Sequence, residues 1–80
     1  MNTEHPRELE QAVKNTLSIY LTELGQQTAT DIHDMVIRHV EKAMLEWMLD
    51  KAKGNQTKAA QILGISRNTL RRKLAQYRIQ

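Results

Sequence analysis

The sequence predicts an all-α protein of four helices, in which two long amino-terminal helices form a dimeric four-helix core and two short helices form a carboxy-terminal helix-turn-helix. Apolar residues recur at intervals of three and four, and no stretch alternates with period two for long enough to form a strand. The one proline and the three glycines fall near the expected helix ends. All acidic residues lie before residue 51, so the two halves of the chain carry opposite charge.

The first helix is expected to begin near Pro6, because proline is tolerated in a first helical turn. Glu8 and Glu10 follow, where the positive end of the helix dipole favours carboxylates. Gly25 is expected to end the helix in the left-handed conformation. One apolar stripe joins these ends: Leu9, Ala12, Val13, Leu17, Tyr20, Leu21 and Leu24.

A polar loop, residues 26–30, leads to a second helix of about 22 residues, for which Thr30 is the expected cap. Apolar residues cover more than one face of this helix, so one partner helix would not bury them all. A second copy of the same helix pair would complete a four-helix core. A monomeric bundle with a few exposed methionines is the alternative.

The third and fourth helices are expected at residues 56–63 and 67–77, and residues 56–76 match a helix-turn-helix. Ala60 must be small because the next helix crosses close to it, and Gly64 occupies a turn position that favours positive φ. Ser66 is placed to cap the fourth helix. The angle between the two helices is filled by Leu63, Ile65, Leu70 and Leu74.

The charge distribution suggests a polyanionic partner for the carboxy-terminal part. Residues 1–50 contain nine acidic and four basic residues, whereas residues 51–80 contain eight basic and no acidic residues. Eighty residues make a single domain, with residues 1–52 for dimerisation and 53–80 for DNA binding. The expected partners are therefore double-stranded DNA and a second copy of the chain. An ordinary solvated basic face is the simpler alternative.

The start of the fourth helix supplies the residues expected to contact DNA bases, since the first residues of a recognition helix reach into the major groove. Arg67 is the first choice for base readout, because arginine binds guanine O6 and N7 with two hydrogen bonds, and Asn68 lies beside it. Contacts to the DNA backbone are expected from Asn55, Thr57, Lys58, Thr69, Arg71, Arg72 and Lys73.

Several other classes of function find no support in the sequence. The chain has no cysteine, which excludes disulfides and thiolate metal sites and suits a cytoplasmic protein. No apolar stretch is long enough for a membrane span, and residues 1–10 do not resemble a signal peptide. No catalytic constellation, cofactor motif or small-molecule site is evident, and His5, His33 and His39 lack metal-ligand spacing. Trp47 is expected in the core or the dimer interface.

Residues 53–60 and 63–74 closely resemble the Fis family of bacterial nucleoid proteins, and a weaker similarity extends to about Leu9. The resemblance implies an intertwined, nucleoid-associated homodimer that bends DNA and regulates transcription. In the family, the arginine matching Arg67 contacts a guanine near each end of a degenerate site, and an A/T-rich centre is read through its deformability. The resemblance also implies an RNA polymerase contact at Lys53, Gly54 and Gln56.

The chain departs from the family pattern at several positions. A chain that begins at Met1 has no room for the amino-terminal hairpin that stimulates DNA invertases, so that activity is not expected. Ala43 replaces a common proline, which predicts a straighter second helix. Asp50 replaces a neutral residue beside the polymerase surface. Ala75 and Gln76 replace frequent lysines, so contacts to flanking DNA should be weaker.

The sequence leaves two alternative functions open. The same carboxy-terminal signature ends the DNA-binding domain of enhancer-binding activators that work with the alternative sigma factor, and the length of the native gene distinguishes this case. The second alternative is a basic protein-interaction adaptor for an acidic partner or an anionic lipid, which would bind DNA without regard to sequence or shape.

Overall fold

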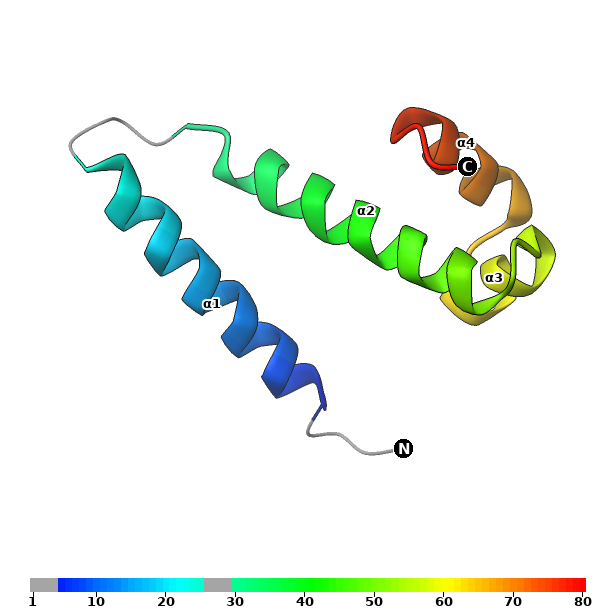
Figure 1. The fold of residues 1–80 in the computed structure, drawn as a ribbon, viewed down its shortest axis with the longest axis horizontal. Helices are drawn as coiled ribbons and strands as arrows, with labels where there is room; N and C mark the ends of the chain where they lie inside the picture. Colours follow the sequence, from blue (N-terminus) through cyan, green and yellow to red (C-terminus); the bar gives the residue numbers. More distant parts are fainter. Residues whose placement is uncertain (1–4, 26–29) are drawn as a thin grey trace. The chain divides into compact units, whose positions relative to one another are not determined.

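The computed structural model describes residues 5–25 and 30–80, and within them the chain forms four helices and no strand (Figure 1). The helices are α1 (His5–Leu24), α2 (Ile32–Lys51), α3 (Gln56–Leu63) and α4 (Arg67–Gln76). The predicted all-α class is therefore confirmed for the described residues. The first 32 residues and residues 33–80 form separate compact units, and each is described by itself.

Helix α1 has the bounds that the sequence predicts. Pro6 lies in its first turn, and Glu8 follows in the same turn, where the helix dipole favours a negative charge. Gly25 follows the last helical residue with φ +64°, and its N–H donates to the Thr22 carbonyl at 3.2 Å. Leu9 and Ile19 on this helix are 59% and 60% exposed.

Helix α2 begins later than the sequence predicts. Its first residue is Ile32, so the flanking residue is Asp31, at φ +58°, and the expectation that Thr30 caps this helix is wrong. The positive φ separates Thr30 from the helix by one residue in a left-handed conformation, too far for a cap. Most of the expected loop, residues 26–29, lies outside the described residues. None of the helices in the described ranges has the length and apolarity needed to cross a bilayer.

The core of the second unit joins the carboxy-terminal half of α2 to α3 and α4, which lie beside it (Figure 1). Leu45 and Leu70 are the largest side chains in this core, each 1% exposed. Ala59 and Ala60 on α3 are also buried, at 1% and 3% exposure, which lets α4 pack closely against α3. The rest of the core consists of Leu49, Ala52 and Leu74, with Met48, Leu63, Ile65, Tyr77 and Ile79 partly buried against it. The expected small residue at position 60 is thus confirmed as a packing requirement.

Candidate nucleic-acid interface

The turn between α2 and α3 is stabilised by backbone hydrogen bonds. The Gly54 N–H donates to the Leu49 carbonyl at 3.0 Å, and the Lys53 N–H donates to the Asp50 carbonyl at 3.0 Å. Lys53 and Gly54 have φ values of +56° and +80°, and both are exposed. This conformation presents residues 53 and 54 to solvent at the start of the basic half of the chain.

Asn55 begins the helix-turn-helix as the cap of α3. Its side-chain Oδ1 accepts a hydrogen bond from the Lys58 N–H at 3.0 Å, which satisfies one of the free amides of the first turn. Thr57 and Lys58 follow with exposed side chains, and Gln56 is half-buried. The exposed side chains of Thr57 and Lys58 therefore face solvent at the start of α3.

The α3–α4 turn has the geometry that the sequence predicts. Gly64 ends α3 at φ +77°, and its N–H donates to the carbonyls of Ala60 at 2.9 Å and Gln61 at 3.2 Å. The Ile65 N–H adds a third bond, to the Ala60 carbonyl at 3.1 Å. These bonds satisfy the carbonyls of Ala60 and Gln61, two of the last four in α3, and end the helix at Leu63. The expected positive φ at Gly64 is confirmed.

Ser66 caps α4, as predicted. Its Oγ accepts from the Thr69 N–H at 3.0 Å and donates to the Thr69 Oγ1 at 2.9 Å. Thr69 is half-buried, and Arg72 Nη2 lies 3.5 Å from the same Oγ1. The Thr69 hydroxyl, a predicted backbone contact, is thus already an acceptor within the first turn of α4.

The outer side of α4 carries the predicted DNA-contacting residues. Leu70 and Leu74 are buried, at 1% and 4% exposure, so this side of the helix faces the core. Residues on the other sides are exposed: Arg67, Asn68, Arg71 and Arg72. Asn68 and Arg72 are two positions from Leu70 and point about 200° away from it, Arg71 is one position from it and points about 100° away, and Arg67 is exposed at the first position of the helix. The structure therefore brings a predicted base-reading pair and two cations to one exposed helix surface.

Lys73, another predicted backbone contact, has a different environment. Its Nζ lies 3.0 Å from Oε2 of Glu41 on α2, and the two side chains are 31% and 22% exposed. The second carboxylate oxygen, Oε1, accepts a hydrogen bond from the Tyr77 hydroxyl at 2.6 Å. Lys73 lies on α4 and Tyr77, the residue that caps its end, follows four positions later, so both reach the same carboxylate. The sequence does not point to Glu41 or Tyr77 as partners, because no sequence pattern relates positions 36 residues apart.

The contacts of Glu41 change two pKa values in opposite directions. The hydrogen bond from Tyr77, followed by the one from Lys73, lowers the pKa of Glu41 below its ordinary value of 4.5, because both donors favour the carboxylate. The hydrogen bond that the Tyr77 hydroxyl donates to Glu41 raises the pKa of Tyr77 above its ordinary value of 10.0, since a phenolate could not donate this hydrogen bond. At neutral pH the carboxylate is charged and the phenol is neutral.

The Glu41 contacts should make folding stability depend on acid pH. A carboxyl with a lowered pKa stabilises the fold fully above its unfolded value, and this contribution disappears as the pH falls through the folded value. Glu41→Gln is therefore expected to be less stable than the wild type at about pH 6, with a smaller difference at about pH 3, below the ordinary value of 4.5. Urea unfolding at both values measures the difference. A stability gap of the same size at both pH values would contradict the assignment.

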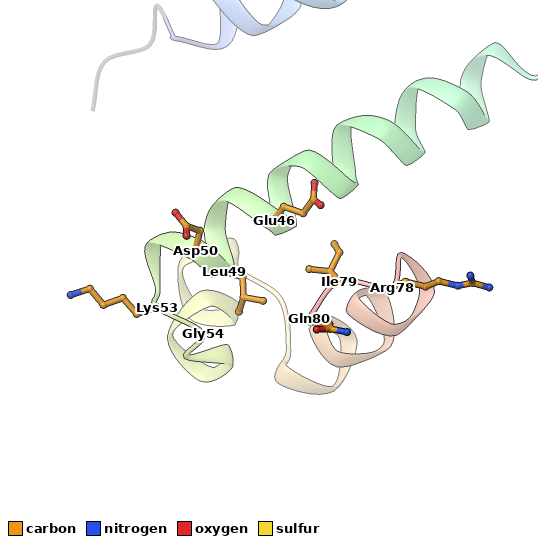
Figure 2. Close-up of a pocket in the computed structure, with 8 residues that line it drawn as sticks. All are labelled: Glu46, Leu49, Asp50, Lys53, Gly54, Arg78, Ile79 and Gln80. Atoms are coloured by element: carbon orange, nitrogen blue, oxygen red, sulfur yellow. The ribbon is translucent and has the colours of Figure 1, made fainter.

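A pocket of about 450 Å³ lies between the end of α2, the following turn and the last residues of the chain. Figure 2 shows Lys53 and Arg78 extending outward in opposite directions, with Leu49 and Ile79 between them. The other lining residues are Glu46, Asp50, Gly54 and Gln80. Charged groups of both signs, most of them exposed, line an open surface. This is unlike the enclosed apolar cavities that hold small molecules.

The remaining candidate residues have ordinary surroundings. The described residues contain no group of three or more histidine, aspartate or glutamate side chains that could hold a metal ion. Trp47 is 59% exposed, so it lies outside the core of residues 33–80, and its expected place in the core of the dimer or in the dimer interface stays a prediction. Lys51 Nζ lies 5.3 Å from the centre of the indole ring, a cation–π contact at an exposed site.

Comparison with known proteins gives consistent matches. Residues 36–77 match the model of a family described as bacterial regulatory protein, Fis family. The chain is 43% identical over 75 residues to a putative Fis-like DNA-binding protein of Pseudomonas aeruginosa, which covers 94% of this chain and 72% of the relative. It is 44% identical over 71 residues to the DNA-binding protein Fis of Aeromonas hydrophila, and this match covers 89% of this chain and 72% of the relative. It is 42% identical over 69 residues to the DNA-binding protein Fis of Actinobacillus succinogenes, and this match covers 86% of this chain and 70% of the relative.

Proposed function

Because the chain belongs to the Fis family of bacterial regulatory proteins, we propose that it is a homodimer that binds duplex DNA through α3 and α4, bends it, and regulates transcription in the nucleoid. DNA binding agrees with the names of the relatives. The observation that best supports it here is the exposed surface of α4, where Arg67, Asn68, Arg71 and Arg72 lie beside a capped and rigid turn.

The contacts are divided between base reading and positioning. Arg67 and Asn68 read base edges from the start of α4, since a recognition helix enters the major groove with its first residues. Contacts to the DNA backbone fix the register and come from Asn55, Thr57, Lys58, Thr69, Arg71 and Arg72. Lys73 contacts the DNA backbone only if a phosphate replaces the Glu41 carboxylate beside its Nζ.

The dimer is supported by apolar side chains that one protomer leaves in water. On α2, Ile37, Val40, Met44 and Trp47 are 50%, 39%, 45% and 59% exposed, and they follow each other at intervals of three, four and three residues. This spacing forms a single stripe along a helix. An 80-residue chain has a small core, and pairing these stripes would bury additional apolar surface.

The turn before α3 is proposed as the contact with RNA polymerase. Lys53 and Gly54 are exposed there, and Gln56 is half-buried at the start of α3. The backbone hydrogen bonds of Lys53 and Gly54 hold the turn in one conformation, as a protein-binding surface requires. Asp50 lies next to them and adds a negative charge to the edge of this surface.

DNA bending is tested by changing bases that the protein does not contact. Two duplexes share the outer guanines and carry either an A/T-rich or a G/C-rich centre. We expect tighter binding to the A/T-rich duplex, as one discrete complex in a gel shift, because its minor groove is compressed at lower cost. Equal affinity, or smearing without a discrete complex, would instead favour a generic basic helix-turn-helix or an adaptor.

A further inference from the structure

Lys73 differs from the other cations of α4 in the direction that it faces. It is three residues after buried Leu70 and four before Tyr77, so these side chains share the side of α4 that faces α2. Arg71 and Arg72 are exposed on the remaining surface of the helix. The side facing α2 is also where the Glu41 carboxylate lies.

The Glu41 carboxylate is held in place by two partners at once. Lys73 Nζ is 3.0 Å from Oε2, and the Tyr77 hydroxyl donates to Oε1 at 2.6 Å. Because the Glu41 side chain is only 22% exposed, water screens this pair less than it screens the Arg38–Asp34 pair, whose side chains are 52% and 72% exposed. A hydrogen bond to each oxygen also fixes the orientation of the carboxylate, so Lys73 meets it without further ordering.

We propose that Glu41 limits the attraction of this protein to DNA of any sequence, because its carboxylate neutralises Lys73 and keeps this ammonium group from binding a phosphate. The inference builds on the proposed function, in which the α3–α4 surface binds duplex DNA. Glu41 does not touch the DNA and acts through Lys73, so it is a positioning residue.

The consequence concerns the affinity for DNA of any sequence. A lysine that binds phosphate strengthens binding to every duplex alike, since the backbone carries no sequence information. Because Glu41 keeps Lys73 from binding a phosphate, the affinity for non-specific DNA is lower. The base contacts of Arg67 and Asn68 are unchanged. The affinity for a specific duplex falls by the same factor, so the ratio between the two affinities is unchanged and only the strength of binding to DNA is limited.

The test is the dependence of the binding constant on salt, measured by fluorescence anisotropy with a mixed-sequence duplex. Each phosphate neutralised contributes about −0.9 to the slope of log K against log salt concentration, so two protomers that recruit one lysine each contribute about −1.8. Glu41→Gln is expected to steepen the slope by this amount and to raise the affinity. Lys73→Gln should leave the slope unchanged, and the double variant should return it to the wild-type value.

Two matched variants separate this effect from a general loss of negative charge or of packing. Glu46→Gln removes the same charge from the same helix, and Glu46 forms no ion pair in the described part of the chain. Tyr77→Phe removes the other partner of Glu41 and keeps the ring. Neither should change the slope. A steeper slope for Glu46→Gln, equal to that of Glu41→Gln, would overturn the proposal.

The same titrations distinguish the proposal from the function on which it depends. Arg72→Gln should make the slope shallower, since Arg72 is a proposed phosphate contact. If the wild type does not bind the duplex, or if Arg72→Gln has no effect on the slope, the proposed DNA-binding surface is wrong. If Arg72→Gln acts as expected but Glu41→Gln does not steepen the slope, the role of Glu41 is wrong.

Circular dichroism checks the fold of each variant. If Glu41→Gln does not fold, Lys73→Gln decides the question alone. An unchanged slope for that variant supports the proposal, because a lysine already neutralised has no charge to lose. A slope as shallow as that of Arg72→Gln overturns it, because Lys73 would then bind phosphate in the wild type.

Discussion

Leu70→Ala is expected to lower the free energy of unfolding of the α2–α4 unit by about 2 to 5 kcal/mol, the range for a buried leucine truncated to alanine. Leu70 is 1% exposed and lies in the core that joins α4 to α2 and α3. Small domains have a total stability of about 5 to 15 kcal/mol, so this loss would remove a large fraction of the stability that keeps the recognition helix docked. Urea unfolding followed by circular dichroism at fixed protomer concentration measures the effect.

Ile62→Ala is the matched control for this prediction. Ile62 belongs to the same helix-turn-helix but is 57% exposed, so its truncation removes little buried surface. The control should unfold at nearly the same urea concentration as the wild type. Equal destabilisation by the two substitutions would mean that Leu70 does not hold α4 in the core, or that another chain covers Ile62.

Arg67→Ala is expected to abolish the preference for a duplex with outer guanines over one in which they are replaced. Arg67 is exposed at the first position of α4, directly after the Ser66 cap, where a side chain can reach a base edge. A bidentate contact is worth about 1 to 3 kcal/mol of discrimination, or about a 5- to 150-fold affinity ratio for each guanine replaced. Gel-shift titrations with the two duplexes give this ratio directly. Residual, salt-sensitive binding should remain, because the phosphate contacts are intact.

Arg72→Ala is the comparison for Arg67→Ala. Arg72 is exposed on the same helix and carries the same charge, but its proposed partner is a phosphate. Its loss should weaken binding to both duplexes by the same factor and leave their ratio unchanged. If Arg67→Ala kept the wild-type ratio, or if Arg72→Ala lost it, the division between base reading and positioning would be wrong.

The sequence by itself determined the elements whose causes are local. The bounds of α1 and α3 follow from apolar spacing and from Pro6, Gly25 and Gly64, and the last helix ends at Gln76, one residue before the predicted end. The cap at Ser66 is equally local, since its partner is three residues away. Thr30 shows the limit of such reasoning, because the conformation of Asp31 at φ +58° delays the start of α2 and a sequence pattern cannot give a φ angle. The opposite charges of the two halves follow from counting their acidic and basic residues.

Only the tertiary structure decided how the basic side chains differ from each other. In the sequence, Arg71, Arg72 and Lys73 are three adjacent cations with the same expected role. Folding leaves the two arginines exposed and brings Lys73 to within 3.0 Å of Glu41, which is 32 residues earlier in the chain. The physical reason is that Leu70 and Leu74 fix the rotation of α4 on α2, and this rotation turns Lys73 and Tyr77 toward the carboxylate.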